Sequence, residues 1–515
     1  MALLGALLKK GLAIRKRAER KPKPPFVLQK KELNKLLFKA QDTAFGRAYQ
    51  FDKIIDSMYD ADPHKFYEEY TKRVPIFTYN EMFTKWWHRA LEGQEDVCWP
   101  GKTMYFALSS GTSEAATKHI PITKAMTKAI QKTSIQQILS LPSYNVPNEA
   151  FEKGVLMLGG STKLTYKGPY FEGDLSGIQA KQLPFWFQSF YKPGKQIAEN
   201  QNWAKKLDEI TLQAKDWDIS VIVGVPAWIQ LLMEKIIAHY NVKTIHDIWP
   251  NLTIYTHGGV SFEPYKKGFE SLLAKPLQYM ETYLASEGFI AYQARPEDKG
   301  MSMSLGSGIF FEFIPFTDDN FNADGDLVSN PQTLMIDQVE EGKDYALLLS
   351  TCAGTWRYMI GDVIRFIDKE KAEIVITGRT KHYISMCGEH LSVENMNKAI
   401  QLTNEDFNID IREFAVAGVP HGNLFAHQWY IGTDDEANAD ELIQKIDKYL
   451  NVLNDDYRVE RQHALRDVSA KVLPTSVFYD FMRMRGKEGG QNKFPRVLKK
   501  QILADWEQFL KDRNL

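Results

Sequence analysis

The sequence predicts an α/β fold with a large N-terminal domain of mixed sheets and flanking helices, and a small C-terminal α+β lid domain. From Lys102 to about Asp368, short apolar runs alternate with amphipathic stretches, as strands and helices do in α/β proteins. A second region starts near Gly378 and spans about 135 residues, the size of a small independent domain. Composition is that of a globular protein, with 44% hydrophobic and 25% charged residues. We therefore predict domains over residues 1–378 and 379–515.

Net charge and cysteine usage exclude several classes of protein. The 64 basic and 65 acidic side chains leave a net charge of −1, which argues against wholesale nucleic-acid binding. No run approaches the roughly 18 apolar residues that a membrane-spanning helix needs. Cys98, Cys352 and Cys387 form neither a disulfide framework nor a metal clip, which is typical of a reducing cytoplasm. We expect a cytoplasmic protein without a Cys or His metal site.

The first 24 residues differ from the rest of the chain in charge. They hold eight basic residues and one acidic residue, Glu19. A leucine stripe from Leu3 to Leu12 has helical spacing, which predicts a basic amphipathic helix over residues 1–24. A secretory signal would carry its charges before the apolar stretch, whereas here they follow it. Such a helix can lie on a membrane surface or dock on the protein's own body, and we prefer the second interpretation.

The alternating region contains a series of strand candidates, each a short apolar run. Amphipathic stretches such as Ala227–His239 and Lys266–Leu273 lie between them, so we expect a largely parallel sheet system. In parallel sheets ligands bind beyond the carboxyl ends of the strands, which directs attention to motifs that follow a strand. The strand candidates are Met104–Leu108, Val155–Leu158, Ile219–Val223, Leu252–Thr256, Leu277–Glu281, Ile309–Ile314 and Ala346–Ser350.

The small domain is predicted to mix helices and strands. Helix candidates are Val393–Leu402 and a segment around Asp440–Leu450, and strand candidates are Phe414–Ala417 and Trp429–Ile431.

A run of hydroxyl residues and one glycine follows the first strand candidate. Its backbone N–H groups and hydroxyls can bind an anion, and glycine permits close approach of a phosphate. Lys118, a few residues on, can add a positive charge. A P-loop pattern is absent, so the run alone does not distinguish a phosphate site from a surface turn. The run is Ser109, Ser110, Gly111, Thr112 and Ser113.

Further segments place glycines and charged residues after later strand candidates. Glycine pairs offer bare backbone against which a flat base can lie, and acids near aromatic residues can bind a ribose or a metal ion. Taken singly, each segment can equally be an ordinary turn, a surface acid or a solvated basic face. The segments are His257–Val260, Tyr283–Gly288, Gly354–Val363, Gly378–Arg379 and Gly490–Arg496.

In this order, the segments resemble those of the adenylate-forming superfamily, which includes acyl-CoA synthetases and firefly luciferase. More closely, the chain resembles the auxin-responsive acyl acid amido synthetase family, known from plants and with bacterial members. The resemblance spans about residues 30–510. Its carriers are Ala40–Gly46, Ser109–Ser113 with Lys118–Pro121, Tyr283–Glu287, Arg357–Asp362 and Lys493–Arg496.

The resemblance implies an ATP- and Mg²⁺-dependent ligase. A carboxylic acid, with aromatic acids among the candidates, would form an acyl-adenylate and release pyrophosphate. An amino acid would then accept the acyl group through its amine. The same resemblance implies a role for each site residue. Glu287 would ligate Mg²⁺, and Lys493 would support the adenylation transition state from a mobile lid. The phosphates would be bound by Ser109, Ser110, Gly111, Thr112, Ser113 and Lys118, and adenine and ribose by Gly258, Gly259, Tyr283, Ser286, Asp362 and Arg379.

Two other interpretations stay open at this point. The acyl group can pass to a thiol such as coenzyme A, or the chain can be a nucleotide-binding protein without catalysis. The presence of Glu287, Asp362 and Lys493 argues against the second. Two departures from the family pattern are Glu114, which puts a negative charge near the expected phosphate site, and Ala285, which stands where the plant pattern has serine.

Overall fold

The computed structural model describes most of the chain. It covers residues 10–11, 23–109, 118–144, 146–183, 187–259, 262–322, 325–380, 384, 391, 393–421, 424–454, 457–458, 461, 465–487, 494–498 and 500–515. Five of the predicted site residues therefore lie outside the described residues, as does most of the predicted helix over residues 1–24. These five are Ser110, Gly111, Thr112, Ser113 and Lys493.

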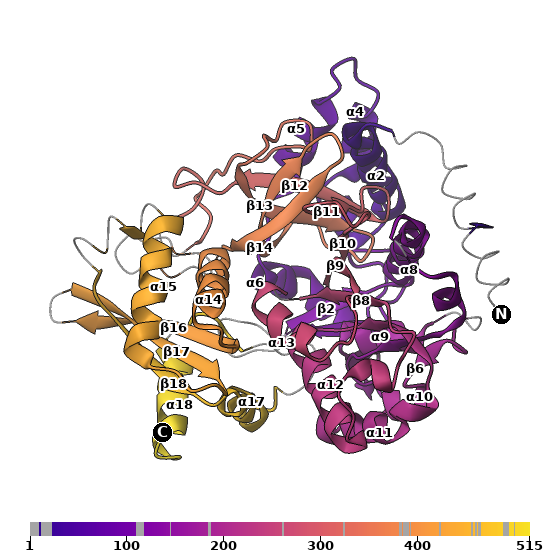
Figure 1. Cartoon of the computed structure of the whole chain (residues 1–515). Helices are drawn as coiled ribbons and strands as arrows, with labels where there is room; N and C mark the ends of the chain where they lie inside the picture. Colours follow the sequence, from indigo (N-terminus) through magenta and orange to yellow (C-terminus); the bar gives the residue numbers. More distant parts are fainter. Residues whose placement is uncertain are drawn as a thin grey trace.

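One large sheet runs through the N-terminal part of the molecule (Figure 1). Among the described residues it has eleven strands in the order β12-β13-β14-β15-β11-β10-β9-β8-β7-β3-β6. Strands β6, β3, β7, β8 and β9 pair in parallel, and the pairs from β9 to β12 are antiparallel. The prediction of a largely parallel sheet is thus wrong for about half of the strands. The α/β class is confirmed.

The change of direction has a local cause. Helices separate β3, β7, β8 and β9 along the chain, and a crossover of this length permits parallel pairing. After β9, only Ser286 and Glu287 precede β10, and a two-residue connection forces an antiparallel hairpin. The strands are β3 (Gly154–Met157), β6 (Tyr191–Lys192), β7 (Ile219–Val223), β8 (Ile254–Gly258), β9 (Gln278–Ala285), β10 (Gly288–Tyr292), β11 (Met301–Met303), β12 (Ile309–Pro315), β13 (Asp344–Thr351), β14 (Tyr358–Asp368) and β15 (Glu373–Arg379).

Helices cover both halves of this sheet. Helix α12 begins with Pro226, whose fixed backbone suits a first turn. It ends at Tyr240 and is followed by Asn241 in the left-handed conformation. Thr123 caps α8, because its hydroxyl accepts from the Met126 N–H at 3.1 Å while donating to the Cys352 carbonyl. The helices are α2 (Pro25–Ala40), α3 (Ala44–Ala48), α4 (Phe51–Ser57), α5 (Lys65–Arg73), α6 (Tyr79–Met82), α7 (His88–Leu91), α8 (Lys124–Ser140), α9 (Leu175–Lys181), α10 (Lys195–Ala198), α11 (Trp203–Gln213), α12 (Pro226–Tyr240) and α13 (Lys266–Ser271).

A small sheet lies beside α8 and α9. Within the described residues its strand order is β2-β1-β5-β4, with bounds β1 (Tyr105–Ser109), β2 (Lys118–Ile122), β4 (Thr165–Tyr166) and β5 (Phe171–Gly173). Ser109 and Lys118 are register partners in the β1–β2 pair, so the predicted phosphate-binding run connects these two strands.

The C-terminal part forms a separate group of elements, which we name the small lobe (Figure 1). Its described strands form one sheet in the order β16-β17-β18. The helices of the small lobe pack on this sheet through two clusters of buried hydrophobic residues. The elements are α14 (Val393–Phe407), β16 (Ile411–His421), β17 (Leu424–Thr433), α15 (Ala439–Leu453), β18 (Leu465–Leu473), α17 (Thr475–Met484) and α18 (Lys500–Lys511). Everything from α2 to β15 is named the large lobe. Among the described residues, no helix is both long and apolar enough to span a bilayer.

Candidate active site

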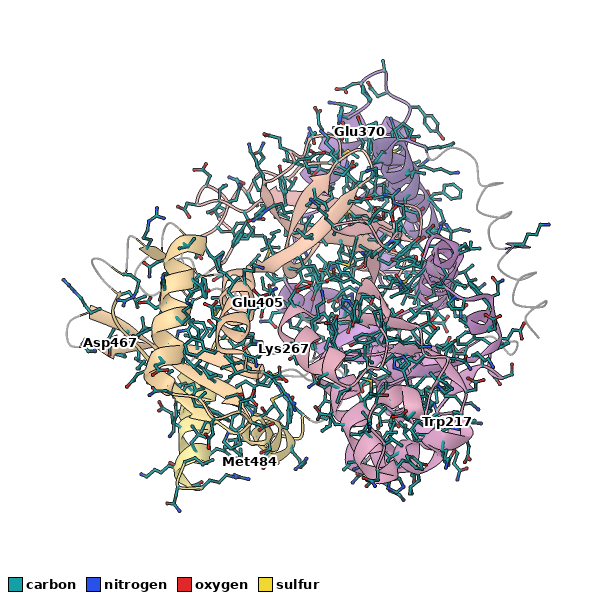
Figure 2. The ribbon with its side chains drawn as sticks, in the orientation of Figure 1. Trp217, Lys267, Glu370, Glu405, Asp467 and Met484 are labelled. Carbon is teal, nitrogen blue, oxygen red and sulfur yellow. The ribbon has the colours of Figure 1, made fainter. Side chains whose placement is uncertain are left out.

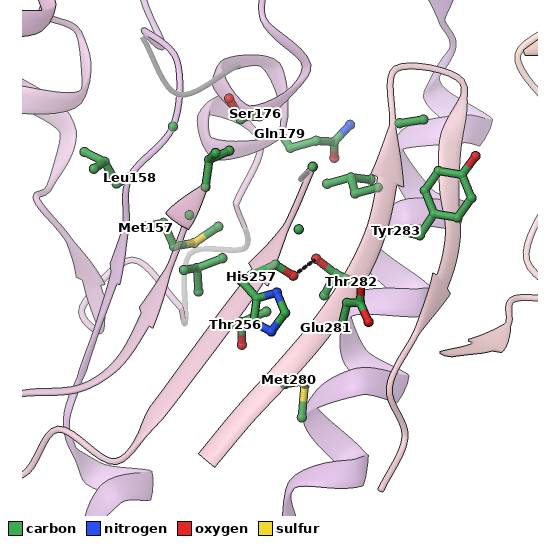
Figure 3. Close-up of a pocket in the computed structure, with 18 of the residues that line it drawn as sticks. Met157, Leu158, Ser176, Gln179, Thr256, His257, Met280, Glu281, Thr282 and Tyr283 are labelled. Carbon is green, nitrogen blue, oxygen red and sulfur yellow. Dashed lines mark hydrogen bonds between the residues drawn. The ribbon is translucent and has the colours of Figure 1, made fainter. Parts of the chain in front are cut away.

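A cavity of about 1300 Å³ lies at the carboxyl ends of the parallel strands. Residues from β3, β7, β8 and β9 line it, together with α8, α9 and the strands β14 and β15. The small lobe contributes α14 residues and Phe494–Arg496. Both lobes therefore meet at one cavity, where ligands commonly bind in open α/β sheets. Figure 3 shows part of it, with the end of β8 at its centre.

Gly258 and Gly259 form the end of β8 against this cavity. A Cβ on Gly258 would lie 2.4 Å from the Thr282 carbonyl oxygen, so only glycine permits this approach of β8 to β9. Gly259 has a φ of +86°, a conformation that other residues rarely adopt. The Thr282 hydroxyl donates to the His257 carbonyl at 2.9 Å, which ties the two strand ends together (Figure 3). The exposed glycine backbone gives a flat surface at the cavity wall.

Tyr283 lies within β9 and not in a loop after it, which corrects the prediction that the strand ends at Glu281. The strand extends to Ala285, and Ser286 and Glu287 alone form the turn to β10. Tyr283 is buried, yet it lines the cavity, as do both turn residues. The predicted aromatic residue, Tyr283, therefore lies in the strand, the predicted carboxylate, Glu287, lies in the turn that follows it, and both line the same cavity.

Asp362 also lies inside a strand, whereas the sequence predicted a position after a glycine turn. Gly361, with a φ of +87°, bends β14 near a shift in its pairing with β15. Asp362 and Arg379 are register partners, and the Arg379 Nε lies 2.9 Å from Asp362 Oδ1. The Tyr283 hydroxyl donates to the other carboxylate oxygen. Three predicted nucleotide-binding residues thus form one hydrogen-bonded group.

Glu287 belongs to the same electrostatic neighbourhood. Its side chain is 7% exposed, and burial raises the pKa of the carboxyl. The negative charge of Asp362 raises this pKa further, while Lys118 and Arg379 lower it. The structure therefore brings Lys118 of β2, Glu287, Asp362 and Arg379 into one charged cluster, although they come from distant parts of the chain.

The Glu287 carboxylate suits a Mg²⁺ ion whose other ligands come from a bound substrate. Among the described residues, no group of three or more His, Cys, Asp or Glu side chains is arranged to hold a metal ion. Mg²⁺ is commonly held by one or two carboxylates together with substrate phosphates, and not by an all-protein cage. Glu287 in the cavity wall fits that pattern.

Several cavity residues had not been predicted. His257 and Glu281 are register partners on β8 and β9, and both line the cavity. His257 directly precedes the glycine pair, which is the only sequence signal for it. Lys206 of α11 and Asp174, just before α9, also line the cavity, and no local motif marks either.

The two lobes are connected by a buried polar contact beside the cavity. Arg496 of the small lobe donates from Nη1 to Glu413 Oε2 at 2.6 Å and from Nη2 to the Tyr265 hydroxyl at 3.1 Å. Tyr265 belongs to the large lobe and directly precedes α13. Nearby, Lys267 donates to Asn408 at 2.7 Å and Arg412 pairs with Glu234 at 3.1 Å. Figure 2 places Lys267 at this boundary.

Three family models match successive parts of the chain. They are the GH3 family N-terminal domain over residues 15–207, the central domain over 302–379 and the C-terminal domain over 394–502. The chain belongs to the GH3 family. This membership confirms the resemblance predicted from the motifs.

Curated relatives of this GH3 protein are plant enzymes of low identity. Indole-3-acetic acid-amido synthetase GH3.4 from Arabidopsis thaliana is 24% identical over 279 residues, 49% of this chain and 45% of that protein. Jasmonoyl--L-amino acid synthetase JAR4 from Nicotiana attenuata is 23% identical over 399 residues, 66% of each. The chain thus spans less than two thirds of the length of these curated relatives.

Solved structures share the fold over nearly the whole chain. AtGH3.15 acyl acid amido synthetase in complex with 2,4-DB has a TM-score of 0.73 at 16% identity, covering 99% of this chain and 96% of that one. A 2-hydroxyisobutyryl-CoA ligase in the postadenylation state has a TM-score of 0.59 at 11% identity, with 94% and 91% covered. These similarities confirm the predicted two-part α/β architecture.

Proposed function

We propose that this GH3 protein is an ATP-dependent acyl acid amido synthetase, which joins a carboxylic acid to an amino acid through an amide bond. The observation that carries the proposal is the group formed by Tyr283, Glu287, Asp362 and Arg379 in one cavity that both lobes line. Membership of the GH3 family and the names of the curated relatives support it.

In the first half-reaction, the carboxylate oxygen of the acid attacks the α-phosphorus of ATP. A P–O bond forms, the bond to the β-phosphoryl group breaks, and pyrophosphate leaves with its electron pair. In this proposal, Asp362 accepts hydrogen bonds from the ribose hydroxyls, while Tyr283, Ser286, Gly258 and Gly259 frame the nucleoside.

The phosphates are assigned to the charged cluster beside Asp362. Arg379 and Lys118 would offset their charge, together with the hydroxyl run Ser109–Ser113. Glu287 would hold Mg²⁺, which neutralises phosphate charge during the displacement. Lys493, three residues before Arg496 in the sequence, would support the charge that develops in the transition state.

In the second half-reaction, the amine of an amino acid attacks the acyl carbon. A C–N bond forms, the C–O bond to AMP breaks, and the amine proton passes to water. We propose that the small domain, residues 379–515, rotates about Gly378–Lys381 relative to residues 1–378 between the two steps, which makes room for the acceptor. A cytoplasmic location is proposed from the cysteine usage.

Pyrophosphate exchange into ATP tests the first half-reaction directly. Purified protein is incubated with ATP, Mg²⁺, labelled pyrophosphate and a panel of aliphatic and aromatic acids. Exchange that requires one of the acids supports adenylation, and a protein that binds ATP without exchange on any acid contradicts it. Amino acids and coenzyme A are then offered in parallel with the active acid. An amide product supports the proposal, whereas a thioester would assign a thiol ligase instead.

A further inference from the structure

Lys206 is a buried cation at the wall of the cavity. Its side chain projects from α11 and the residue is 2% exposed. Its ammonium donates to the carbonyl oxygens of Gly159 and Gly160 at 3.1 and 3.3 Å. An ammonium has three N–H donors, and these two bonds use two of them. The ammonium also lies 5.6 Å from the centre of the Trp203 ring, and Lys206 lines the cavity, so the third donor is available to a ligand there. Burial lowers the pKa of Lys206 to about 8, against the raising effect of Asp174, which leaves it mostly protonated at pH 7.

Asp174 supplies the complementary group at the same end of the cavity. Its carboxylate packs over Gly160, where an added Cβ would lie 2.0 Å from Asp174 Oδ2. Asp174 lines the cavity and acts electrostatically on Lys206. Burial raises the pKa of the Asp174 carboxyl, and the charge of Lys206 lowers it. With both groups ionised, the pair offers one hydrogen-bond donor and one acceptor with no net charge. An added anion or cation would leave an uncompensated charge in a buried site, whereas a neutral group would not.

This polar end lies away from the proposed nucleotide end. Gly159 and Gly160 follow β3, and Glu287 follows β9, with β7 and β8 between them. At a spacing of about 4.8 Å between strands, the end of β3 lies roughly 14 Å from Glu287 and about 10 Å from Gly258, which the proposed function assigns to the nucleoside. We assign the group that meets Lys206 to the acyl acid, because the apolar part of the cavity wall suits the body of such an acid. The wall between the ends is mixed. Its apolar side chains are Ile135, Ile138, Val155, Met157, Val223 and Met280, and its polar ones include Ser134, Gln137, Thr256, His257 and Glu281.

We propose that the Lys206–Asp174 end of the cavity binds a neutral group that both donates and accepts a hydrogen bond, most simply a hydroxyl, at the end of the acyl acid remote from its carboxyl. The proposal rests on the proposed function, since it assigns the substrate class of the same site. The acid then has a mainly apolar middle that passes β7 and β8, where Thr256, His257 and Glu281 also line the wall, a reactive carboxylate on the Glu287 side and a hydroxyl at Lys206.

The test compares matched acids in pyrophosphate exchange. Straight-chain acids of increasing length are paired with their ω-hydroxy counterparts, and arylalkanoic acids are used with and without a ring hydroxyl. At the best length, the hydroxy acid should have a kcat/KM about tenfold higher than its partner, as one hydrogen bond to a charged group implies. Lys206→Met should remove this preference, so that the two acids of a pair have equal kcat/KM, and Asp174→Asn should reduce the preference.

Lys205→Met is the matched control, because Lys205 is the neighbouring exposed lysine of α11. It should keep the native preference. If native protein exchanges with both acids of every pair equally, or if Lys206→Met keeps the preference, the assignment of the hydroxyl site is overturned and the proposed function stands. If no acid supports exchange, the proposed function is overturned, and this substrate class with it.

Discussion

His257 combines nearly complete burial with a titratable ring next to the Gly258–Gly259 turn. It is 7% exposed, and its Nδ1 has no hydrogen-bond partner among the described residues. Burial lowers the pKa of His257 from 6.5 to about 4. Because the folded-state pKa is depressed, stability is complete above pH 6.5 and is lost as pH falls from there towards 4.

We therefore expect His257 to lower the free energy of unfolding by roughly 2 kcal/mol at pH 5 relative to pH 7. The loss is about 1.4 kcal/mol for each pH unit below the pKa of His257 in the unfolded chain. Urea unfolding of native protein and His257→Gln at both values of pH measures this difference. The variant should lose clearly less stability on acidification. Equal losses in the two proteins would show that the imidazole does not titrate as its burial implies.

Lys493 is the residue whose role depends most on the family resemblance, because it lies outside the described residues. Lys493→Ala should slow adenylation by about 10²–10³-fold while ATP binding stays near native, since the lysine is expected to act on transition-state charge. Single-turnover formation of the acyl-adenylate and equilibrium ATP binding give the two readings. Lys500→Ala, on the first turn of α18, is the control. Native-rate adenylation by Lys493→Ala would refute the assignment.

At the scale of elements, β14 carries Asp362 and is anchored just before its start by a buried ion pair. Arg357 Nε lies 2.9 Å from Glu312 Oε1 of β12, with both side chains at most 5% exposed. Arg357 has a φ of +40°, and its guanidinium also donates to the Val74 carbonyl at 2.8 Å. The Tyr67 hydroxyl donates to Glu312 at 3.0 Å. The start of β14 is thereby tied to the N-terminal helices and to β12.

Arg357→Met should destabilise the protein by about 3–5 kcal/mol, because it leaves the Glu312 carboxylate buried without its cation. Adding Glu312→Gln should recover much of this loss, since the amide is neutral and still accepts from Tyr67. Urea unfolding midpoints of the single and double variants provide the comparison. A single variant with native stability would contradict the structural role given to the pair.

The elements also show what could be predicted from the sequence. β7 has the predicted bounds Ile219–Val223, because the run is apolar and ends at a glycine. β9 is longer than predicted and β14 was not among the strand candidates, because the polar residues Thr282, Tyr283 and Asp362 interrupt the apolar runs by which strands were recognised. The antiparallel half of the sheet was missed because β10, β11 and β14 were not among the strand candidates, so the short connections between consecutive strands were not recognised. Lys206 and Asp174 left no local pattern, because their meeting depends on how α11 packs on the end of β3.

At the scale of the whole molecule, the Tyr265–Arg496 hydrogen bond joins the two lobes next to the cavity. The Tyr265 hydroxyl is shared between Arg496 and Glu413, and Tyr265 is 2% exposed. Arg496 also stacks over Phe414, with its guanidinium carbon 4.3 Å from the ring centre. The small lobe presents Phe494–Arg496 to the cavity in this arrangement.

Tyr265→Phe should slow adenylation at least about tenfold and leave aminolysis of a supplied acyl-adenylate near native. It removes two hydrogen bonds to charged groups, Arg496 and Glu413, which hold the arrangement of the lobes that we assign to the first half-reaction. Tyr279→Phe is the matched control, since that hydroxyl bonds to Glu270 within the large lobe. Equal slowing of both half-reactions would indicate general destabilisation instead.

If one nucleotide, bound between the two lobes, activates a carboxylate as its adenylate, one oxygen of the acid must end in AMP. An isotope label follows that oxygen. The acid is labelled with ¹⁸O in its carboxylate, the reaction with ATP and an amino acid is run to completion, and the products are weighed by mass spectrometry. Attack of the carboxylate on the α-phosphorus, followed by cleavage of the acyl C–O bond, predicts one labelled oxygen in AMP. Label in inorganic phosphate with formation of ADP, or unlabelled AMP alongside the amide, would contradict it.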